Sequence, residues 1–227
     1  MTTLYIANKN YSSWSLRPWV LMTQLGIPFD EQLQVFGEGS NWDAFRQFSP
    51  NGRVPCLHDG DTVVWDSLAI MEYLAEHHAG VWPSRPDARS WARCASAEMH
   101  SGFSTLRNAC GMSCGVRVRL HALDAALKAD VARINELWNE GLTRFGGPFL
   151  AGDAFTAVDA FYAPVVFRIQ SYDLPTDGAA TAYVHRMLAL PSMRQWYTAA
   201  LAEPWRDHAH EEETRLYGDM VDDFRAG

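Results

Sequence analysis

The stretch RVPCLHDGDTVVWDSLAIMEYL, residues 53–74, decides the fold class. Two short apolar runs flank Asp59-Gly60-Asp61, and an Asp-Gly pair between such runs is a strong β-hairpin signal. After Ser67 the apolar side chains recur at helical spacing, which predicts a short helix. The stretch therefore predicts a hairpin followed directly by a helix.

The residues before this stretch alternate between the same two patterns. Residues 4–7 form a short apolar run typical of a buried strand, and residues 29–36 alternate between apolar and polar as a second strand does. Between them, serines, an early proline and a closing Gly26 mark a helix over 12–25. Aromatic residues at helical spacing predict another short helix over 42–48. Residues 1–79 are therefore expected to form a small α/β domain.

Beyond residue 80 the strand signals disappear. Residues 80–89 contain glycine and two prolines and predict a linker. Residues 90–227 are expected to form an all-α second domain that ends in a charged, solvent-exposed tail from His208. Its helices are predicted, in chain order, over 89–119 with an interruption at 110–115, and over 123–145, 155–172, 183–190 and 192–201.

Composition excludes several classes of protein. The chain has 227 residues, of which 48% are hydrophobic, and a formal net charge of −8, which disfavours a nucleic-acid-binding protein. Four cysteines are too few for a disulfide scaffold. We see neither a secretory signal nor an apolar run long enough to span a membrane. A soluble cytoplasmic protein with no membrane or nucleic-acid partner is expected.

Ser12 and Ser13 stand between the first predicted strand and the first predicted helix. Free N–H groups and a partial positive charge make a helix N-terminus favourable for anions, and a hydroxyl there can donate a hydrogen bond to a thiolate. Lowering a thiol pKa by about 2 units from its usual ~8.5 requires roughly 2.7 kcal/mol of differential stabilisation. The alternative reading is that the two serines only cap the helix.

Two further element boundaries carry polar or constrained residues. Val54-Pro55 leads into a strand, and a cis peptide bond there would leave the Val54 backbone free for a peptide ligand, although most X–Pro bonds are trans. Asp66-Ser67 opens a helix, where the hydroxyl can hold a carboxylate and Asp66 an ammonium group, or where both simply cap the helix. Together the three boundaries would fit a zwitterionic peptide that bears a thiol.

Other motifs favour structural roles. Thr156 and Asp159 match a capping box at the start of an apolar helix. Cys110 and Cys114 have no His or acidic partner at ligand spacing, so no metal site is expected. The phosphate-binding, nucleophile-elbow and metalloprotease motifs are absent from the sequence.

In their order and spacing these motifs resemble the cytosolic glutathione transferases over about residues 2–205. The resemblance rests on residues 12–17, 53–57, 66–70 and 149–159. It implies a thioredoxin-like N-terminal domain that binds glutathione, an all-α C-terminal domain that forms the electrophile pocket, and a homodimer. Glutathione would be the cosubstrate.

The resemblance also implies roles for individual residues. Ser12, or its neighbour Ser13, corresponds to the hydroxyl that activates the thiol. The expected glutathione-binding residues are Arg53, Val54, Pro55 as the family's cis proline, and Asp66 and Ser67 as the clamp for the γ-glutamyl unit.

The serine motif is most similar to the zeta class, whose members isomerise maleylacetoacetate. Trp14 stands where that class has a cysteine, and Arg168 lies one turn before Ser171, where its carboxylate-binding arginine is expected. We therefore expect conjugation of small hydrophobic electrophiles, with isomerase activity as the alternative. The predicted electrophile-binding residues are Trp14, Phe103, Arg107 and Arg168.

Two other functional classes remain open. A non-catalytic binding or interaction protein could share the fold, although it would not need Ser12, Val54 and Ser67. A thiol-disulfide reductase would require a cysteine where Ser12 or Ser13 stands.

Overall fold

The computed structural model describes residues 1–226. Its first domain holds a four-stranded sheet of order β2-β1-β3-β4, in which β1 runs parallel to β2 and antiparallel to β3. This order confirms the predicted α/β domain, including the hairpin between β3 and β4. The elements are β1 (Thr2–Ile6), α1 (Ser13–Leu25), β2 (Asp30–Leu33), α2 (Trp42–Phe45), β3 (Cys56–Asp59), β4 (Thr62–Trp65) and α3 (Ser67–His77).

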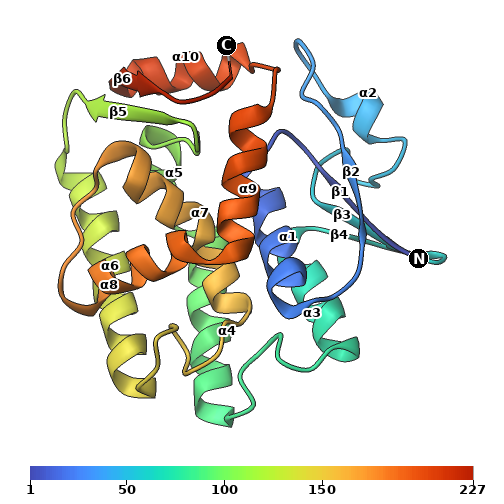
Figure 1. Cartoon of the computed structure of the whole chain (residues 1–227), viewed down its shortest axis with the longest axis vertical. Helices are drawn as coiled ribbons and strands as arrows, with labels where there is room; N and C mark the ends of the chain where they lie inside the picture. Colours follow the sequence, from blue (N-terminus) through green and yellow to red (C-terminus); the bar gives the residue numbers. More distant parts are fainter. Residues whose placement is uncertain (227) are drawn as a thin grey trace.

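Helix α1 lies between the sheet and the second domain (Figure 1). It carries the chain from β1 to the parallel strand β2, and it ends where Gly26 adopts the left-handed conformation with φ of 66°. Its side chains Leu16, Val20 and Leu21 are fully buried because the helix is covered by the sheet and by helices of the other domain. The N-terminus of α1 is therefore fixed at the junction of the two domains.

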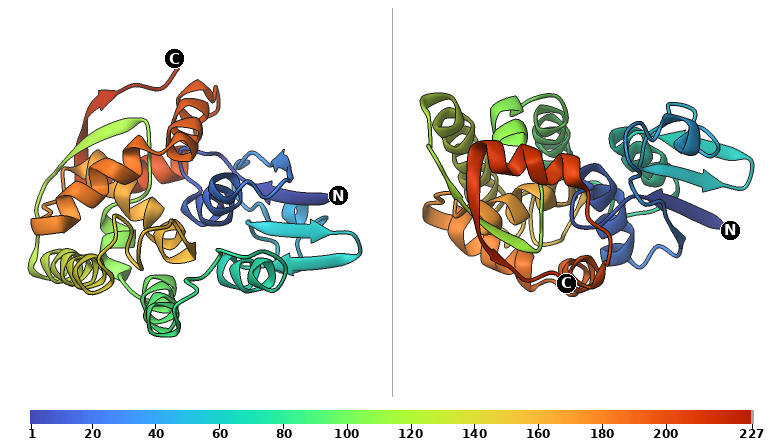
Figure 2. Two further views of the ribbon diagram at one scale, coloured as in Figure 1. Left: turned by 60° about the horizontal axis from the view of Figure 1, so that its bottom comes forward. Right: turned by 90° about the horizontal axis from the view of Figure 1, so that it is seen from above.

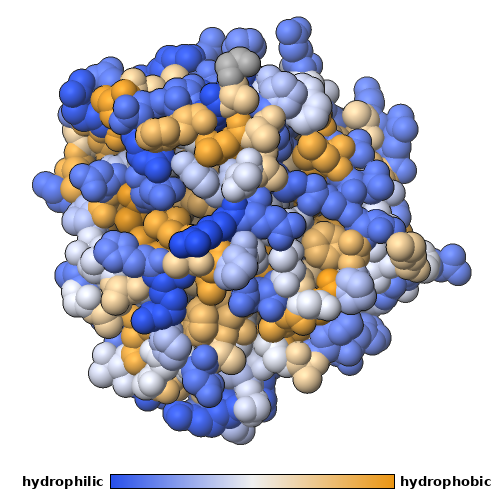
Figure 3. Space-filling model, in the orientation of Figure 1, coloured by the Kyte–Doolittle hydropathy of each residue, from blue (hydrophilic) through white to orange (hydrophobic). Residues whose placement is uncertain are grey.

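The second domain is helical, as predicted. Helix α7 runs through its centre and packs against α1 and α4, and nearly all of its side chains are buried. On the face that Figure 3 shows, hydrophilic residues are interspersed with small apolar patches. Among residues 1–226 no helix is long and apolar enough to cross a membrane. The helices are α4 (Pro86–Ser101), α5 (Ser104–Ala109), α6 (Ala125–Phe145), α7 (Ala157–Tyr172), α8 (Gly178–Ala189), α9 (Pro191–Ala202) and α10 (His208–Tyr217).

The predicted capping box opens α7. Asp159 is fully buried and accepts hydrogen bonds from the backbone N–H of Thr156 (2.9 Å), the N–H of Leu150 (3.0 Å) and the hydroxyl of Tyr183 (3.1 Å). Burial raises the pKa of this carboxyl to about 6. One side chain thus ties the start of α7 to the preceding loop and to α8.

Two expectations for this half of the chain are wrong. The predicted helix over 89–119 is divided into α4, α5 and a strand, β5 (Val116–Leu120), and the tail is no free end. It forms α10 and a strand, β6 (Gly218–Asp223), that pairs antiparallel with β5 (Figures 1 and 2). Strand β5 forms because Val116 and Val118 are buried on one face while the intervening arginines face outward, and β6 supplies its backbone partners.

Candidate active site

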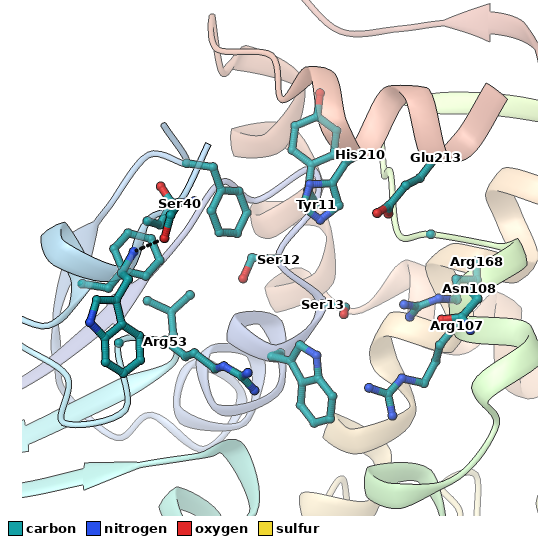
Figure 4. Close-up of a pocket in the computed structure, with 18 residues that line it drawn as sticks. Tyr11, Ser12, Ser13, Ser40, Arg53, Arg107, Asn108, Arg168, His210 and Glu213 are labelled. Atoms are coloured by element: carbon teal, nitrogen blue, oxygen red, sulfur yellow. Dashed lines mark hydrogen bonds between the residues drawn. The ribbon is translucent and has the colours of Figure 1, made fainter. Parts of the chain in front are cut away.

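A cavity of about 490 Å³ opens between the two domains (Figure 4). Its walls come from the start of α1, the loops around α2 and β3, the helices α5 and α7, and α10 of the tail. Seven of the residues singled out from the sequence are among those that line it: Ser12, Ser13, Trp14, Arg53, Val54, Arg107 and Arg168.

The two serines lie at the N-terminus of α1, and neither side chain caps that helix. Ser12 is buried, and its hydroxyl donates to the Ser15 hydroxyl at 2.7 Å, which in turn accepts from the Ala7 N–H at 3.3 Å. Ser13 is half-buried, lies toward Arg107 and Arg168, and makes no side-chain hydrogen bond within residues 1–226 (Figure 4). Both hydroxyls are therefore placed to meet a ligand at the positive end of a helix.

Val54 lines the same cavity. Within residues 1–226 neither its N–H nor its C=O forms a hydrogen bond, and its peptide bond to Pro55 is cis, as the resemblance implies. Arg53 beside it is exposed and lines the cavity. Free backbone donors and acceptors next to a cavity are the groups that an extended peptide ligand pairs with.

Asp66 and Ser67 are not among the residues that line this cavity. The Asp66 carboxylate caps α3 by accepting from the backbone N–H of Leu68 at 2.8 Å, as the capping alternative predicts. Ser67 is buried, and its hydroxyl accepts from Arg17 at 3.3 Å. Ser67 is thus linked through Arg17 to Trp14, which lines the cavity.

Arg17 has an unusual environment for a guanidinium group. It is 2% exposed, stacks on Trp14 at 4.1 Å, and has a buried Nε without a partner. Burial, followed by repulsion from Arg107 and Arg168, lowers its pKa to about 9. Sequence reasoning did not single out Arg17, because an arginine in the first turns of a helix gives no signal of burial.

Arg107 and Arg168 form the wall opposite Arg53 (Figure 4). Each is held by a backbone carbonyl: Arg107 donates to the C=O of His100 at 3.2 Å, and Arg168 donates through Nε to the C=O of Cys110 at 2.7 Å. Burial lowers the pKa of both, that of Arg168 to about 10, and no carboxylate of residues 1–226 forms an ion pair with either. Two guanidinium groups without protein counter-ions therefore face the cavity.

Phe103, predicted to contact the electrophile, is not among the residues that line this cavity. Phe103 separates α4 from α5, adopts a left-handed backbone conformation with φ of 55°, and lies in the hydrophobic core with 7% exposure. Because the helix breaks at this point, Phe103 no longer lies on the same face as Arg107, which does reach the cavity.

Comparison with known proteins agrees with this architecture. Residues 11–77 match the family model of the glutathione S-transferase N-terminal domain, and residues 117–199 match that of the C-terminal domain. The chain belongs to the glutathione S-transferase family. Membership confirms the predicted fold and enzyme class, with glutathione as the cosubstrate, while the serine-type, zeta-like subtype stays a prediction.

Relatives of this transferase are distant and varied. The glutathione S-transferase GstB of Escherichia coli is 24% identical, over 90% of this chain and 95% of its own. A probable maleylacetoacetate isomerase of Caenorhabditis elegans is 28% identical, over 75% and 80%. The structure of a theta class glutathione S-transferase from Xanthomonas axonopodis pv. citri, with glutathione bound, aligns with a TM-score of 0.63 and 22% identity over 86% of this chain and 96% of that one.

The transferase cavity also contains residues that sequence reasoning missed. Tyr11 lines it but directs its hydroxyl away from Ser12, toward the tail (Figure 4). His210 and Glu213 reach it from α10, which the sequence presented only as a charged tail. No group of three or more His, Cys, Asp and Glu side chains in residues 1–226 is arranged to hold a metal ion.

Proposed function

We propose that this transferase joins glutathione to small electrophiles, and that the Ser12 hydroxyl stabilises the reacting thiolate. The observation that carries the proposal is a pair of hydroxyls, unused as helix caps, at the end of α1 that faces the inter-domain cavity. In the reaction the thiolate forms a C–S bond to the electrophilic carbon, the leaving group departs with its electron pair, and the thiol proton goes to solvent.

The hydrogen-bond chain behind Ser12 supports its role. Because hydroxyl hydrogens rotate, Ser15 can donate to Ser12 once Ser12 donates to a thiolate, and the Ala7 N–H then supports Ser15 from behind. Such a chain polarises each donor and strengthens the last one. Ser13, whose hydroxyl has no such support, is the alternative donor.

Residues 1–79 are proposed to bind glutathione. Residues 90–227, which follow the linker 80–89, are proposed to form the pocket for the electrophile. The Val54 N–H and C=O would pair with the cysteinyl unit of the peptide. We propose that the peptide extends beyond the cavity, so that its γ-glutamyl carboxylate meets Ser67 and the buried Arg17 beside it and supplies the counter-ion that this guanidinium lacks.

Calorimetry tests glutathione binding. We expect Ser67→Ala to weaken the affinity about tenfold, since a hydrogen bond to a charged group contributes about 1.5–3 kcal/mol. Ser90→Ala is the matched control, because Ser90 is exposed on α4 and bonds only to its own helix. Failure of the unmodified protein to bind glutathione would contradict the proposed function. Equal glutathione affinities of the two variants would contradict the role of Ser67 as a clamp for the γ-glutamyl unit.

A second candidate function is favoured by Arg107 and Arg168. Guanidinium groups that face a cavity without protein counter-ions suit a substrate carboxylate, which isomerisation of maleylacetoacetate would provide. The aromatic residues Trp14, Phe36 and Trp42 in the same cavity would instead contact an apolar electrophile. The two candidates differ in whether the substrate must be anionic.

A pair of matched electrophiles separates them. We expect Arg168→Gln to lower kcat/KM for chlorodinitrobenzoate about thirtyfold and to change that for the neutral chlorodinitrobenzamide less than about threefold. Each rate is divided by the uncatalysed rate with glutathione, and Arg194→Gln, an exposed arginine of α9, is the control. If Arg168→Gln lowers kcat/KM equally for both substrates, Arg168 does not bind the substrate carboxylate, and the isomerase candidate loses its support.

We also propose that the chain is a cytoplasmic homodimer with a role in detoxification. Family membership supports these proposals. A non-catalytic binding or interaction protein with the same fold is the competing hypothesis, and the absence of turnover with any electrophile would favour it.

A further inference from the structure

The C-terminal tail, residues 203–226, is bonded to the segment that carries the catalytic serines. The Glu203 carboxylate accepts from the backbone N–H of Lys9 at 2.7 Å and from that of Asn10 at 3.3 Å. The loop before β5 also contacts this segment, because the Gly115 N–H donates to the Asn10 side chain at 3.2 Å. We call this set of contacts between residues 9–11, the loop before β5 and the tail the tail junction. Residues far apart in the sequence therefore meet directly beneath Ser12.

Tyr11 is the contact nearest to Ser12. Its hydroxyl donates to the Glu211 carboxylate at 3.0 Å and accepts from the Arg225 guanidinium at 2.8 Å. Burial raises the pKa of Tyr11 to about 12, so the hydroxyl keeps its proton and remains a donor. Both hydrogen-bonding capacities of this hydroxyl are thus used by the tail rather than by the cavity.

Arg225 connects several parts of the tail junction. Its side chain is only 2% exposed, and it is ion-paired to Glu211 at 2.6 Å and, in a bidentate manner, to Asp223 at 2.8 and 2.6 Å. Its aliphatic stem crosses Gly115, where a Cβ atom would come within 2.3 Å of the arginine Cγ. The pairing of β6 with β5 brings Arg225 to this place, and the Phe224 N–H is bonded to the Gly115 C=O at 2.8 Å.

The backbone links Tyr11 to the serines. The Ser13 N–H donates to the Tyr11 C=O at 2.9 Å, and the N–H groups of Tyr11 and Ser12 both donate to the Asn8 C=O. The Tyr11 ring also stacks on His210 of α10, with centroids 5.3 Å apart. The Tyr11 side chain, fixed by the tail, and the peptide groups on either side of Ser12 are therefore parts of one hydrogen-bonded segment.

We propose that Arg225 is a positioning residue, which acts through the Tyr11 hydroxyl to hold the Ser12 hydroxyl at the thiol of bound glutathione. This inference rests on the proposed function and extends it, since it makes the last residues of the tail part of the catalytic apparatus. Loss of the bond between Arg225 and Tyr11 would leave glutathione bound, because Arg225 does not line the cavity and the Tyr11 hydroxyl is directed toward the tail (Figure 4).

The test compares Arg225→Gln and Tyr11→Phe with Arg215→Gln in the full-length protein. Arg215 is the matched control because it also pairs with Glu211, at 3.2 Å, but is 52% exposed and does not reach Tyr11. We expect the first two variants to raise the thiol pKa of bound glutathione by about half a unit to one unit and to lower kcat about tenfold. Their KM for glutathione and all properties of Arg215→Gln should stay within about twofold.

Three outcomes would overturn the inference. If both test variants keep the wild-type thiol pKa and kcat, the tail junction is only structural. If Arg215→Gln shows the same rise in thiol pKa and the same fall in kcat, the effect comes from Glu211 and not from the bond between Arg225 and Tyr11. If Arg225→Gln does not fold, Tyr11→Phe decides alone, since it leaves the ion pairs of Arg225 intact. A wild-type protein that binds glutathione without lowering its thiol pKa would contradict the proposed function itself, and the inference with it.

Discussion

Replacing Ser12 with alanine is expected to lower kcat/KM for chlorodinitrobenzene about a hundredfold. The reason is the thiolate population: a pKa lowered by about 2 units corresponds to roughly 2.7 kcal/mol, and its loss leaves about one hundredth of the thiolate at a pH below the pKa. The Ser12 hydroxyl can supply this because it lies at the positive end of α1 and is supported by Ser15. Steady-state kinetics with saturating glutathione measures the effect.

Two companion variants identify the donor. Ser15→Ala should cost about fivefold, because it removes the hydroxyl behind Ser12 but leaves the donor itself. Ser13→Ala should remain within about threefold of wild type. If Ser13→Ala shows the large loss instead, the role passes to Ser13, and if neither variant loses activity, the backbone N–H groups of α1 stabilise the thiolate without a hydroxyl.

The second large effect concerns stability. Asp159→Ala is expected to reduce the free energy of unfolding by about 3–5 kcal/mol, because it leaves the Leu150 N–H, the Thr156 N–H and the Tyr183 hydroxyl buried without an acceptor. Urea unfolding at neutral pH measures it. Asp153→Ala is the control, since Asp153 is exposed in the same loop and should cost less than about 0.5 kcal/mol. Equal midpoints for the two variants would show that the capping box does not stabilise α7.

Much of the first domain could be predicted because its signals are local. Asp59-Gly60-Asp61 determines the hairpin within a few residues, and Gly26 ends α1 through its own backbone freedom. Several residues of the cavity could also be predicted from their position in the sequence. Ser12, Ser13 and Val54 stand at element boundaries, where side chains and backbone groups remain free to bind a ligand. Asp66 stands at such a boundary too, and its carboxylate caps its own helix, so its role in binding glutathione stays a prediction.

The tail could not be predicted in this way. The alternation in Val116-Arg117-Val118-Arg119-Leu120 is a strand signal, but it is short and lies within a helical context, and its partner β6 is about a hundred residues away. No local pattern indicates such a pairing, so the sequence predicts neither His210 and Glu213 as cavity residues nor Arg225 as a partner of Tyr11. Phe103 was misplaced for a related reason, because the break between α4 and α5 turns its side chain into the core.

The central claim is that this cavity binds glutathione and lowers the pKa of its thiol. Titration of the thiolate ultraviolet absorbance of glutathione bound to the wild-type protein tests it most directly, with the protein spectrum and free glutathione subtracted. We expect the bound thiol to titrate about 1–2 units below its usual value near ~8.5. A bound thiol that titrates at the value of free glutathione would contradict the account.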